Sequence, residues 1–154
     1  MFSYRHAFHA GNHADVLKHI TLLATLRHLM RKDSPLLLVD THAGAGIYRL
    51  DGGAAQTSGE AAAGIARMQA LWAHPDFDEK SASAPANKAQ AAINNEADAL
   101  ADYLALIAGF NRGGNDDWRV YPGSPLLMHA LMTEPARAPV HDRLKLFEMH
   151  RSEE

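Results

Sequence analysis

The sequence contains no cysteine, so it can form neither a disulfide nor a thiolate metal site. It also lacks any uninterrupted apolar run near the roughly 20 residues that a membrane-spanning helix needs. The N-terminal residues 1–15 have no apolar segment of the kind that a secretory signal carries. These absences favour a cytoplasmic protein without a membrane partner.

What is present is a chain of 154 residues, of which 47% are hydrophobic and 21% are charged. This composition predicts one soluble globular domain with a sizeable core. The length is nevertheless short for a complete nucleotide-binding α/β enzyme.

The net charge of −3 argues by itself against a nucleic-acid partner, but the charge is unevenly distributed. Residues 1–32 hold five Lys or Arg side chains and five of the ten His, against Asp15 alone. Residues 74–102 are predominantly acidic. Only the first region could attract phosphates, although a merely solvated helix face would carry similar charges.

The first half of the chain predicts a helix, a strand and a loop, in that order. Apolar residues recur at helical spacing over 13–32, and Asn12 is a suitable N-cap. The apolar run 36–39 predicts a parallel strand buried on both faces, ending at Asp40. The polar, glycine-rich segment 48–58 is interpreted as a loop.

The second half predicts helices followed by another strand. Ser58 is a candidate cap for a helix over 59–73, and a second helix is expected over 90–109, after an exposed insert at 74–89. Residues 118–121 are expected to be briefly extended. Ser124 is a good N-cap, with Pro125 at the first position, for a helix reaching Met132.

A second buried strand is predicted over 144–148. Two strands joined by a long helical crossover open a doubly wound α/β sheet.

Residues 40–46, DTHAGAG, directly follow the first predicted strand. Glycines let a backbone turn sharply and approach a nucleotide-like ligand, which binds beyond the carboxyl ends of strands in such sheets. An ordinary strand-to-helix turn could have the same composition. The third glycine of a dinucleotide fingerprint is absent after Gly46, which disfavours a dinucleotide oxidoreductase. The loop is nearer to that of amino-group methyltransferases, with His42 in the aromatic position.

Glu148 ends the second predicted strand, where a carboxylate can accept hydrogen bonds from both ribose hydroxyls of an adenosine. Its distance from the glycine loop is far longer than the usual spacing, as expected if a helical subdomain is inserted between the strands. A carboxylate in this place could also be solvent-exposed without a role.

The N-terminus is rich in histidine, with His6, His9, His13 and His19 in one short stretch. Zinc binding is disfavoured because no cysteine or well-placed carboxylate completes a site. The alternative is an RNA surface in which the Tyr4 and His6 rings stack on bases and the Lys18 ammonium holds phosphate. His19 could instead face a cofactor.

Five motifs occur in an order that resembles the RlmJ family of bacterial 23S rRNA adenine-N6 methyltransferases. They are SYRHAFHAGNHADVLKH, LVDTHAGAGIY, TSGE around Ser58, YPGSP at 121–125 and LFEMH at 146–150. The first is long and highly specific, so the resemblance does not depend on the glycine loop. It implies a class I, Rossmann-like α/β methyltransferase fold, S-adenosyl-L-methionine as cofactor and 23S ribosomal RNA as partner, without a metal.

The resemblance implies roles for individual residues. His19 and His42 match cofactor-binding histidines, Ser124 matches a cofactor-binding serine, and Glu148 matches the acidic residue that holds the cofactor ribose. Gly44 belongs to the loop expected to approach the cofactor. Tyr4 matches a position near the RNA, and His6 and Lys18 resemble its neighbours.

The sequence departs from the family in one large respect. The family's catalytic D-P-P-Y motif is absent, since no Pro-Pro pair occurs in the 154 residues. The expectation is the N-terminal part of a methyltransferase domain, 1–154, with an incomplete fold, a helical insert at about 53–115 and no catalytic residue. Alone it is expected to be inactive and to self-associate. The alternative is a truncated, non-catalytic product that binds cofactor or RNA weakly.

Overall fold

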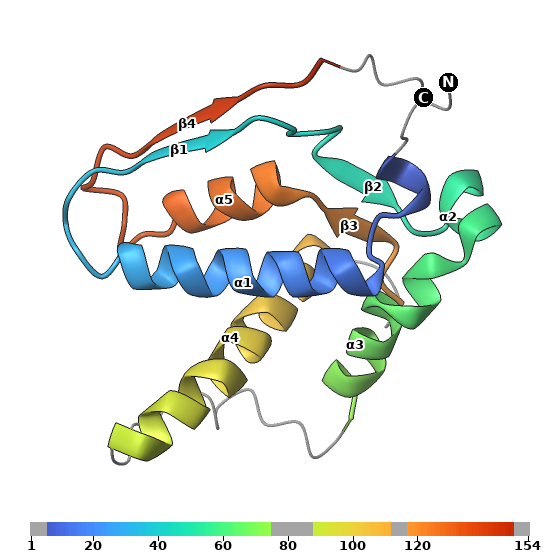
Figure 1. Cartoon of the computed structure of the whole chain (residues 1–154), viewed down its shortest axis with the longest axis horizontal. Coiled ribbons are helices and arrows are strands. Elements are labelled where there is room, and N and C mark those ends of the chain that lie inside the picture. Colours follow the sequence, from blue (N-terminus) through green and yellow to red (C-terminus); the bar gives the residue numbers. More distant parts are fainter. Residues whose placement is uncertain (1–5, 75–87, 112–116, 150–154) are drawn as a thin grey trace.

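The structure, a computed structural model, describes residues 6–74, 88–111 and 117–149, with residues 88–98 described by their backbone alone. Helices and short strands alternate along the chain in a mixed α/β arrangement (Figure 1). In order, the elements are η1 (His6–Phe8), α1 (His13–Leu29), β1 (Leu37–Asp40), β2 (Ile47–Arg49), α2 (Gly53–Ser58), η2 (Glu60–Ala63), α3 (Ile65–Trp72), α4 (Lys88–Phe110), β3 (Val120–Pro122), α5 (Ser124–Met132) and β4 (Arg143–Leu146).

The helix α1 begins where the sequence predicts. The Asn12 side chain accepts a hydrogen bond from the Asp15 backbone N–H and so satisfies one of the unpaired donors of the first turn. The buried side of α1 carries Val16, His19, Leu23 and Leu26. None of the helices in the described ranges is long and apolar enough to cross a membrane.

The strands β1 and β4 form a parallel pair, with Leu37 opposite Arg143 and Asp40 opposite Leu146. This confirms the predicted parallel pairing of two strands that the helical part of the chain separates. The helix α5 contacts both strands, and α1 packs in turn against α5 and α4 (Figure 1).

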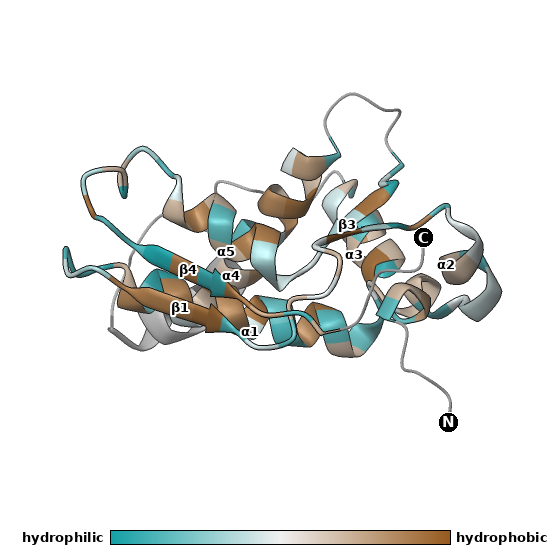
Figure 2. Cartoon of the chain, turned by 90° about the horizontal axis from the view of Figure 1, so that it is seen from above, coloured by the Kyte–Doolittle hydropathy of each residue, from teal (hydrophilic) through white to brown (hydrophobic). Residues whose placement is uncertain are grey.

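The prediction that the first strand is buried on both faces is wrong, and the second predicted strand is not fully buried either. Successive side chains of a strand point to opposite faces. The face carrying Leu38 and Leu144 packs on the core, whereas Leu37 and Val39 are 57% and 51% exposed on the other. Figure 2 looks onto the pair from above, where β1 is coloured as strongly apolar.

The segment 48–58 is not the single loop that its composition predicts. It includes the end of β2, which pairs antiparallel with β3 so that Tyr48 lies opposite Tyr121, and all of α2. The pairing brings together residues more than 70 positions apart in the chain, and such a partner cannot be read from local composition.

The predicted helix over 59–73 is interrupted. Gly59, with φ of 67°, ends α2, and Gly64 separates η2 from α3. A Cβ at Gly64 would lie 2.1 Å from the Gly11 carbonyl oxygen, which accepts a hydrogen bond from the Ile65 N–H. The break therefore allows α3 to approach the turn that precedes α1.

The remaining helices agree with the sequence. The helix α4 covers the predicted 90–109, and α5 ends at the predicted Met132. The predicted insert at 74–89 lies almost wholly outside the described residues.

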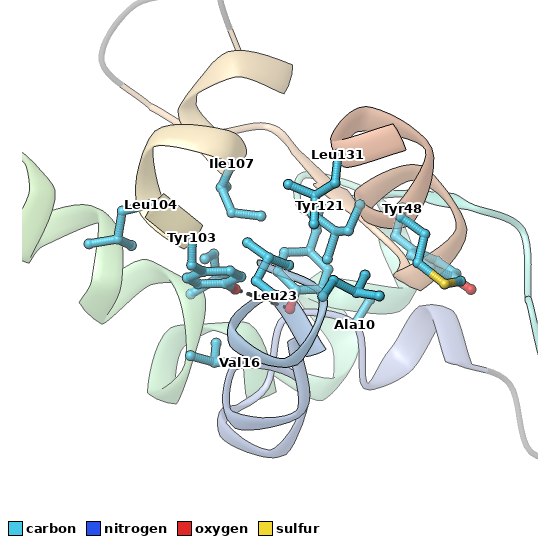
Figure 3. Packing of buried hydrophobic residues seen from close by; sticks show 13 residues of the cluster. Ala10, Val16, Leu23, Tyr48, Tyr103, Leu104, Ile107, Tyr121 and Leu131 are labelled. Carbon is cyan, nitrogen blue, oxygen red and sulfur yellow. Dashed lines mark hydrogen bonds between the residues drawn. The ribbon is translucent and has the colours of Figure 1, made fainter. Parts of the chain in front are cut away.

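The core lies where α1, α4, α5 and β3 meet (Figure 3). Leu23, Leu104, Ile107 and Leu131 are completely buried there. At its edge the Arg27 guanidinium hydrogen-bonds Asp102 of α4 at 2.7 Å and Glu134 after α5 at 2.5–2.8 Å, so one cation links three segments.

Candidate cofactor and RNA site

The carboxylate of Asp40 organises the carboxyl end of β1. Its Oδ1 accepts a hydrogen bond from the His42 backbone N–H at 3.0 Å, and its Oδ2 accepts one from the Ser124 hydroxyl at 2.6 Å. Asp40 therefore connects the glycine loop with the first residue of α5. The prediction that Ser124 is the N-cap is wrong, because Gly123 occupies that position and the Ser124 side chain turns to Asp40 instead.

The loop after β1 runs beside the segment that follows β4. The Gly44 N–H donates to Glu148 Oε2 at 2.7 Å, and the Ala43 N–H donates to the Phe147 carbonyl at 3.0 Å. Gly44 and Gly46 have φ of 64° and 80°, in the left-handed region that favours glycine. The fold thus brings His42, Gly44 and Glu148 together, and Ser124 joins them through Asp40.

Tyr48 connects this loop with the N-terminal turn. Its hydroxyl accepts a hydrogen bond from the Ala45 N–H at 3.1 Å, and its ring meets the His6 ring edge-on at 5.0 Å. A Cβ at Gly44 would lie 2.2 Å from that hydroxyl. Gly44 is therefore required by the loop itself, in addition to any ligand.

Asp15 contacts His6 and Lys18, two of the residues expected on the RNA surface. One of its oxygens is 2.9 Å from His6 Nε2 and accepts the Gly11 N–H, while the other accepts Lys18 Nζ at 2.5 Å. Burial alone would raise the pKa of Asp15, but the hydrogen bonds from His6 and Lys18 outweigh it and hold the pKa well below its usual range. Tyr4, the third residue expected on this surface, lies outside the described residues.

The histidines at the N-terminus do not converge on one point. His9 Nδ1 lies 3.0 Å from both oxygens of Glu60, which also accepts Asn12 Nδ2 at 2.9 Å, whereas His6 contacts Asp15. Within 6–74, 88–111 and 117–149, no group of three potential ligands is placed to hold a metal ion.

Sequence reasoning missed the structural parts played by Asp15, Glu60 and Asp40. Each has a partner on another element: His6 for Asp15, His9 for Glu60 and Ser124 for Asp40. Local spacing can indicate the Asp15–Lys18 pair within α1 but not these contacts.

His19 is completely buried, and its ring stacks on that of Tyr121 at a centroid distance of 5.5 Å. Its Nδ1 lies 2.7 Å from the Tyr121 hydroxyl, whereas its Nε2 is buried and has no hydrogen-bond partner among the described residues. Burial, together with the charge of Lys18, lowers the pKa of His19 to about 4, so the imidazole is neutral at physiological pH.

These residues suit an adenosine-bearing cofactor. Asp40 ends β1, Glu148 lies just beyond the end of β4, and the loop with two left-handed glycines runs between them. Open α/β proteins bind nucleotides at this edge, beyond the carboxyl ends of the parallel strands. The unpartnered Nε2 of His19 is a buried polar atom that a ligand could satisfy. The fold and the site together define a mixed α/β protein with a small parallel sheet, as expected for a methyltransferase.

Comparison with known proteins gives the family. The family model described as "Ribosomal RNA large subunit methyltransferase D, RlmJ" matches residues 33–154. Over 153 residues, 99% of this chain, the sequence is 41% identical to ribosomal RNA large subunit methyltransferase J of Escherichia coli K12 and 37% identical to that of Haemophilus influenzae. The chain therefore belongs to the RlmJ family of ribosomal RNA large subunit methyltransferases.

The chain spans 44% of the length of each of these two relatives. A solved structure shows the same relation. The crystal structure of protein LPL1258 from Legionella pneumophila matches 94% of this chain with a TM-score of 0.62 and 31% identity, and the match covers 42% of that protein.

Proposed function

We propose that the complete protein transfers a methyl group from S-adenosyl-L-methionine to an adenine N6 amino group of 23S ribosomal RNA, in the cytoplasm. The observation that carries the proposal is the match of 99% of this chain to two proteins named ribosomal RNA large subunit methyltransferase J. The grouping of polar side chains at the carboxyl ends of β1 and β4 supports it.

In this proposal the cofactor lies against the glycine loop. Glu148 accepts hydrogen bonds from the ribose hydroxyls, and Gly44 gives the loop its left-handed turn. His42, Ser124 and His19 contribute further polar contacts. Asp40 supports this arrangement, since it fixes both the His42 backbone and the Ser124 hydroxyl.

The RNA side of the site is assigned to Tyr4, His6 and Lys18. Lys18 is half exposed and lies next to His6 through their common contact with Asp15. A cation and aromatic rings in one place suit an unpaired nucleotide, because the cation holds phosphate while the rings stack on bases. Tyr48 contacts both the His6 ring and the Ala45 N–H of the glycine loop, which supports an RNA surface next to the proposed cofactor site.

The cofactor, when bound, supplies an electrophilic methyl group on a sulfonium sulfur. The exocyclic adenine amine is a poor nucleophile because its lone pair is delocalised into the ring, so positioning and electrostatics carry most of the catalysis. We assign these 154 residues to binding and orientation, with no catalytic residue among them. They form the N-terminal part of a class I, Rossmann-like domain, with a helical insert over about 53–115.

The cofactor site is tested by titrating S-adenosylhomocysteine into the chain in a calorimeter. Glu148→Ala should weaken binding by roughly 1–3 kcal/mol, the range for losing hydrogen bonds to a charged group. Asp33→Ala, which removes an exposed carboxylate before β1 begins, at the other end of that strand from the loop, is the matched control and should bind normally. Equal affinity of both variants would contradict the assignment of Glu148.

The RNA surface is tested with the complete protein, unmodified 23S rRNA and labelled S-adenosyl-L-methionine. Lys18→Ala should reduce RNA affinity and lower the slope of log affinity against log salt by about one, while cofactor affinity is unchanged. Lys32→Ala, at the other end of the α1 segment, is the control and should leave the slope as it was. N6-methyladenosine in the digested RNA identifies the product, and its absence in the presence of cofactor binding would refute the reaction.

A further inference from the structure

A buried chain of hydrogen bonds runs from α4 through β3 to α1. The Tyr103 and Tyr121 hydroxyl oxygens are 3.2 Å apart, and the Tyr121 hydroxyl is 2.7 Å from His19 Nδ1. Figure 3 shows the two tyrosine side chains meeting within the apolar core. All three residues are completely buried.

The donors and acceptors in this chain of hydrogen bonds favour one direction. Each hydroxyl has one hydrogen to donate, and a neutral imidazole has one N–H and one accepting nitrogen. If Tyr103 donates to Tyr121 and Tyr121 donates to His19 Nδ1, both hydroxyl hydrogens are used and only the Nε2–H lacks a partner.

The opposite direction also makes two hydrogen bonds, but it leaves a different hydrogen over. His19 would donate from Nδ1 to Tyr121, and Tyr121 would donate to Tyr103. The Tyr103 hydrogen would then have no acceptor among the described residues. A phenol O–H is a better donor than an imidazole N–H, and an imidazole nitrogen is a better acceptor than a phenol oxygen, so the first direction is preferred. A ligand that accepts the Nε2–H would then leave no hydrogen of the three groups without an acceptor, which the opposite direction cannot achieve.

We propose that Tyr103 and Tyr121 are positioning residues that hold His19 in the tautomer with its proton on Nε2, so that this N–H donates to an acceptor atom of bound S-adenosyl-L-methionine. This rests on the proposed function, which places His19 in the cofactor site. The hydrogen bond at Nδ1 decides which ring nitrogen of His19 carries the proton, as the hydrogen-bond partners of metal-bound histidines do.

Two further observations agree with this arrangement. The His19 ring feels the charge of Asp40, which organises the end of β1. Burial keeps the imidazole neutral, and only a neutral imidazole has two tautomers to choose between. Because His19 is fully covered, an acceptor reaches Nε2 only when covering groups move aside. Binding is therefore expected to alter the NMR signals of this ring.

The tautomer is tested by long-range proton–nitrogen NMR on the chain labelled with nitrogen-15 in histidine. The His19 signals should show a protonated Nε2 and an unprotonated Nδ1 at pH 7, and Tyr121→Phe should abolish this preference. Tyr103→Phe, one step further from the ring, should weaken it and serves if Tyr121→Phe does not fold. Exposed His28 is the internal reference and should be unaffected. A protonated Nδ1 in the wild-type chain would overturn the proposal.

The link to the cofactor is tested by titration with S-adenosylhomocysteine. Tyr121→Phe should weaken binding by roughly three- to tenfold, the loss expected for one well-oriented hydrogen bond, and should have no further effect in a His19→Gln background. Wild-type affinity in a folded Tyr121→Phe chain that has lost the tautomer preference would overturn the link. No binding by the wild-type chain would count against the proposed function itself, whereas the tautomer measurement is independent of it.

Discussion

At the scale of single residues, two buried groups make the fold sensitive to acid for different reasons. Asp15 has a pKa below its usual range, so the stability that it contributes is lost as the pH falls below about 4. His19 has a pKa lowered to about 4, against about 6.5 in an unfolded chain. Between these two values the unfolded chain binds a proton that the folded chain does not, so stability falls as the pH falls.

The contribution of His19 can be separated from that of the carboxylates by staying above pH 5. Between pH 7 and pH 5 the lowered pKa should cost the folded chain about 2 kcal/mol of unfolding free energy. His19→Gln should lower stability at pH 7 but remove most of this pH dependence, as measured by urea unfolding at both pH values. His28→Gln changes an exposed histidine of the same helix and should keep the wild-type slope. An identical slope in the His19 variant would show that this ring titrates normally.

Gly44 makes a second prediction at this scale. Gly44→Ala should destabilise the loop, because the new Cβ would lie 2.2 Å from the Tyr48 hydroxyl at a φ of 64°. Tyr48→Phe removes that oxygen and leaves the nearest remaining contact at 3.6 Å, so the double variant should be more stable than the sum of the two single changes. Gly53→Ala, with no atom within 4 Å of its Cβ, is the control. Strict additivity in thermal unfolding would contradict the clash.

At the scale of elements, the sequence predicts the helices and strands that are specified by residues close together in the chain. Asn12 and the apolar repeat specify α1, and the apolar runs specify β1 and β4, since caps and periodicity act within a few residues. The sequence missed β2 and the break at Gly64, because both depend on contacts with distant backbone.

The candidate site divides in the same way. The glycine loop and Glu148 could be located from strand ends, and the structure brings Gly44 and Glu148 to 2.7 Å. The link from Ser124 to Asp40 and the contact of His6 with Asp15 could not be predicted. Each joins side chains whose separation in space is decided by packing rather than by spacing along the chain.

The start of the parallel pair is held by a buried ion pair. Arg137 donates to both oxygens of Asp142 at 2.7 and 2.9 Å and to the carbonyls of Met30, Lys32 and Ser34 after α1. Asp142 also accepts the Leu36 N–H. The ion pair lies at the amino ends of the strands, whereas the glycine loop lies at their carboxyl ends, so the role of Asp142 is structural.

Asp142→Asn should therefore lower the thermal unfolding midpoint by several degrees, because it leaves a buried guanidinium without its anion. Asp51→Asn removes the partner of Arg49 from an equally close but exposed pair, and it should have little effect. Similar losses from the two changes would mean that burial of the Arg137 pair adds nothing to stability.

At the scale of the whole molecule, the outer face of the parallel pair is the largest departure from a closed core. Leu37 and Val39 on this face, and Leu146 and Phe147 at the end of β4, are about half exposed, and Met149 is 96% exposed. Within the described ranges β1 and β4 pair only with each other, so each also has an unpaired edge. Apolar faces and open edges of this kind favour association.

The 154-residue chain by itself is expected to self-associate as its concentration rises, which sedimentation velocity would detect. Replacing Leu37 and Val39 together by Thr should reduce association, because it makes the exposed face polar while keeping residues suited to a strand. Leu17→Thr alters a side chain that is more exposed, at 68%, but lies on α1 away from this face, and it should leave association unchanged. Equal effects of the two variants would mean that the contact is elsewhere.

The pairing of β1 with β4 has a consequence for how the chain acquires its fold during synthesis. Residue 37 finds its partner only at residue 143, so β1 leaves the ribosome long before β4 exists. At about 5–20 residues per second, that interval lasts roughly 5–20 s. During this interval the apolar run 36–39 has no strand partner, whereas α1 can already begin to form. The protein is thus most exposed to misassembly while it is being made.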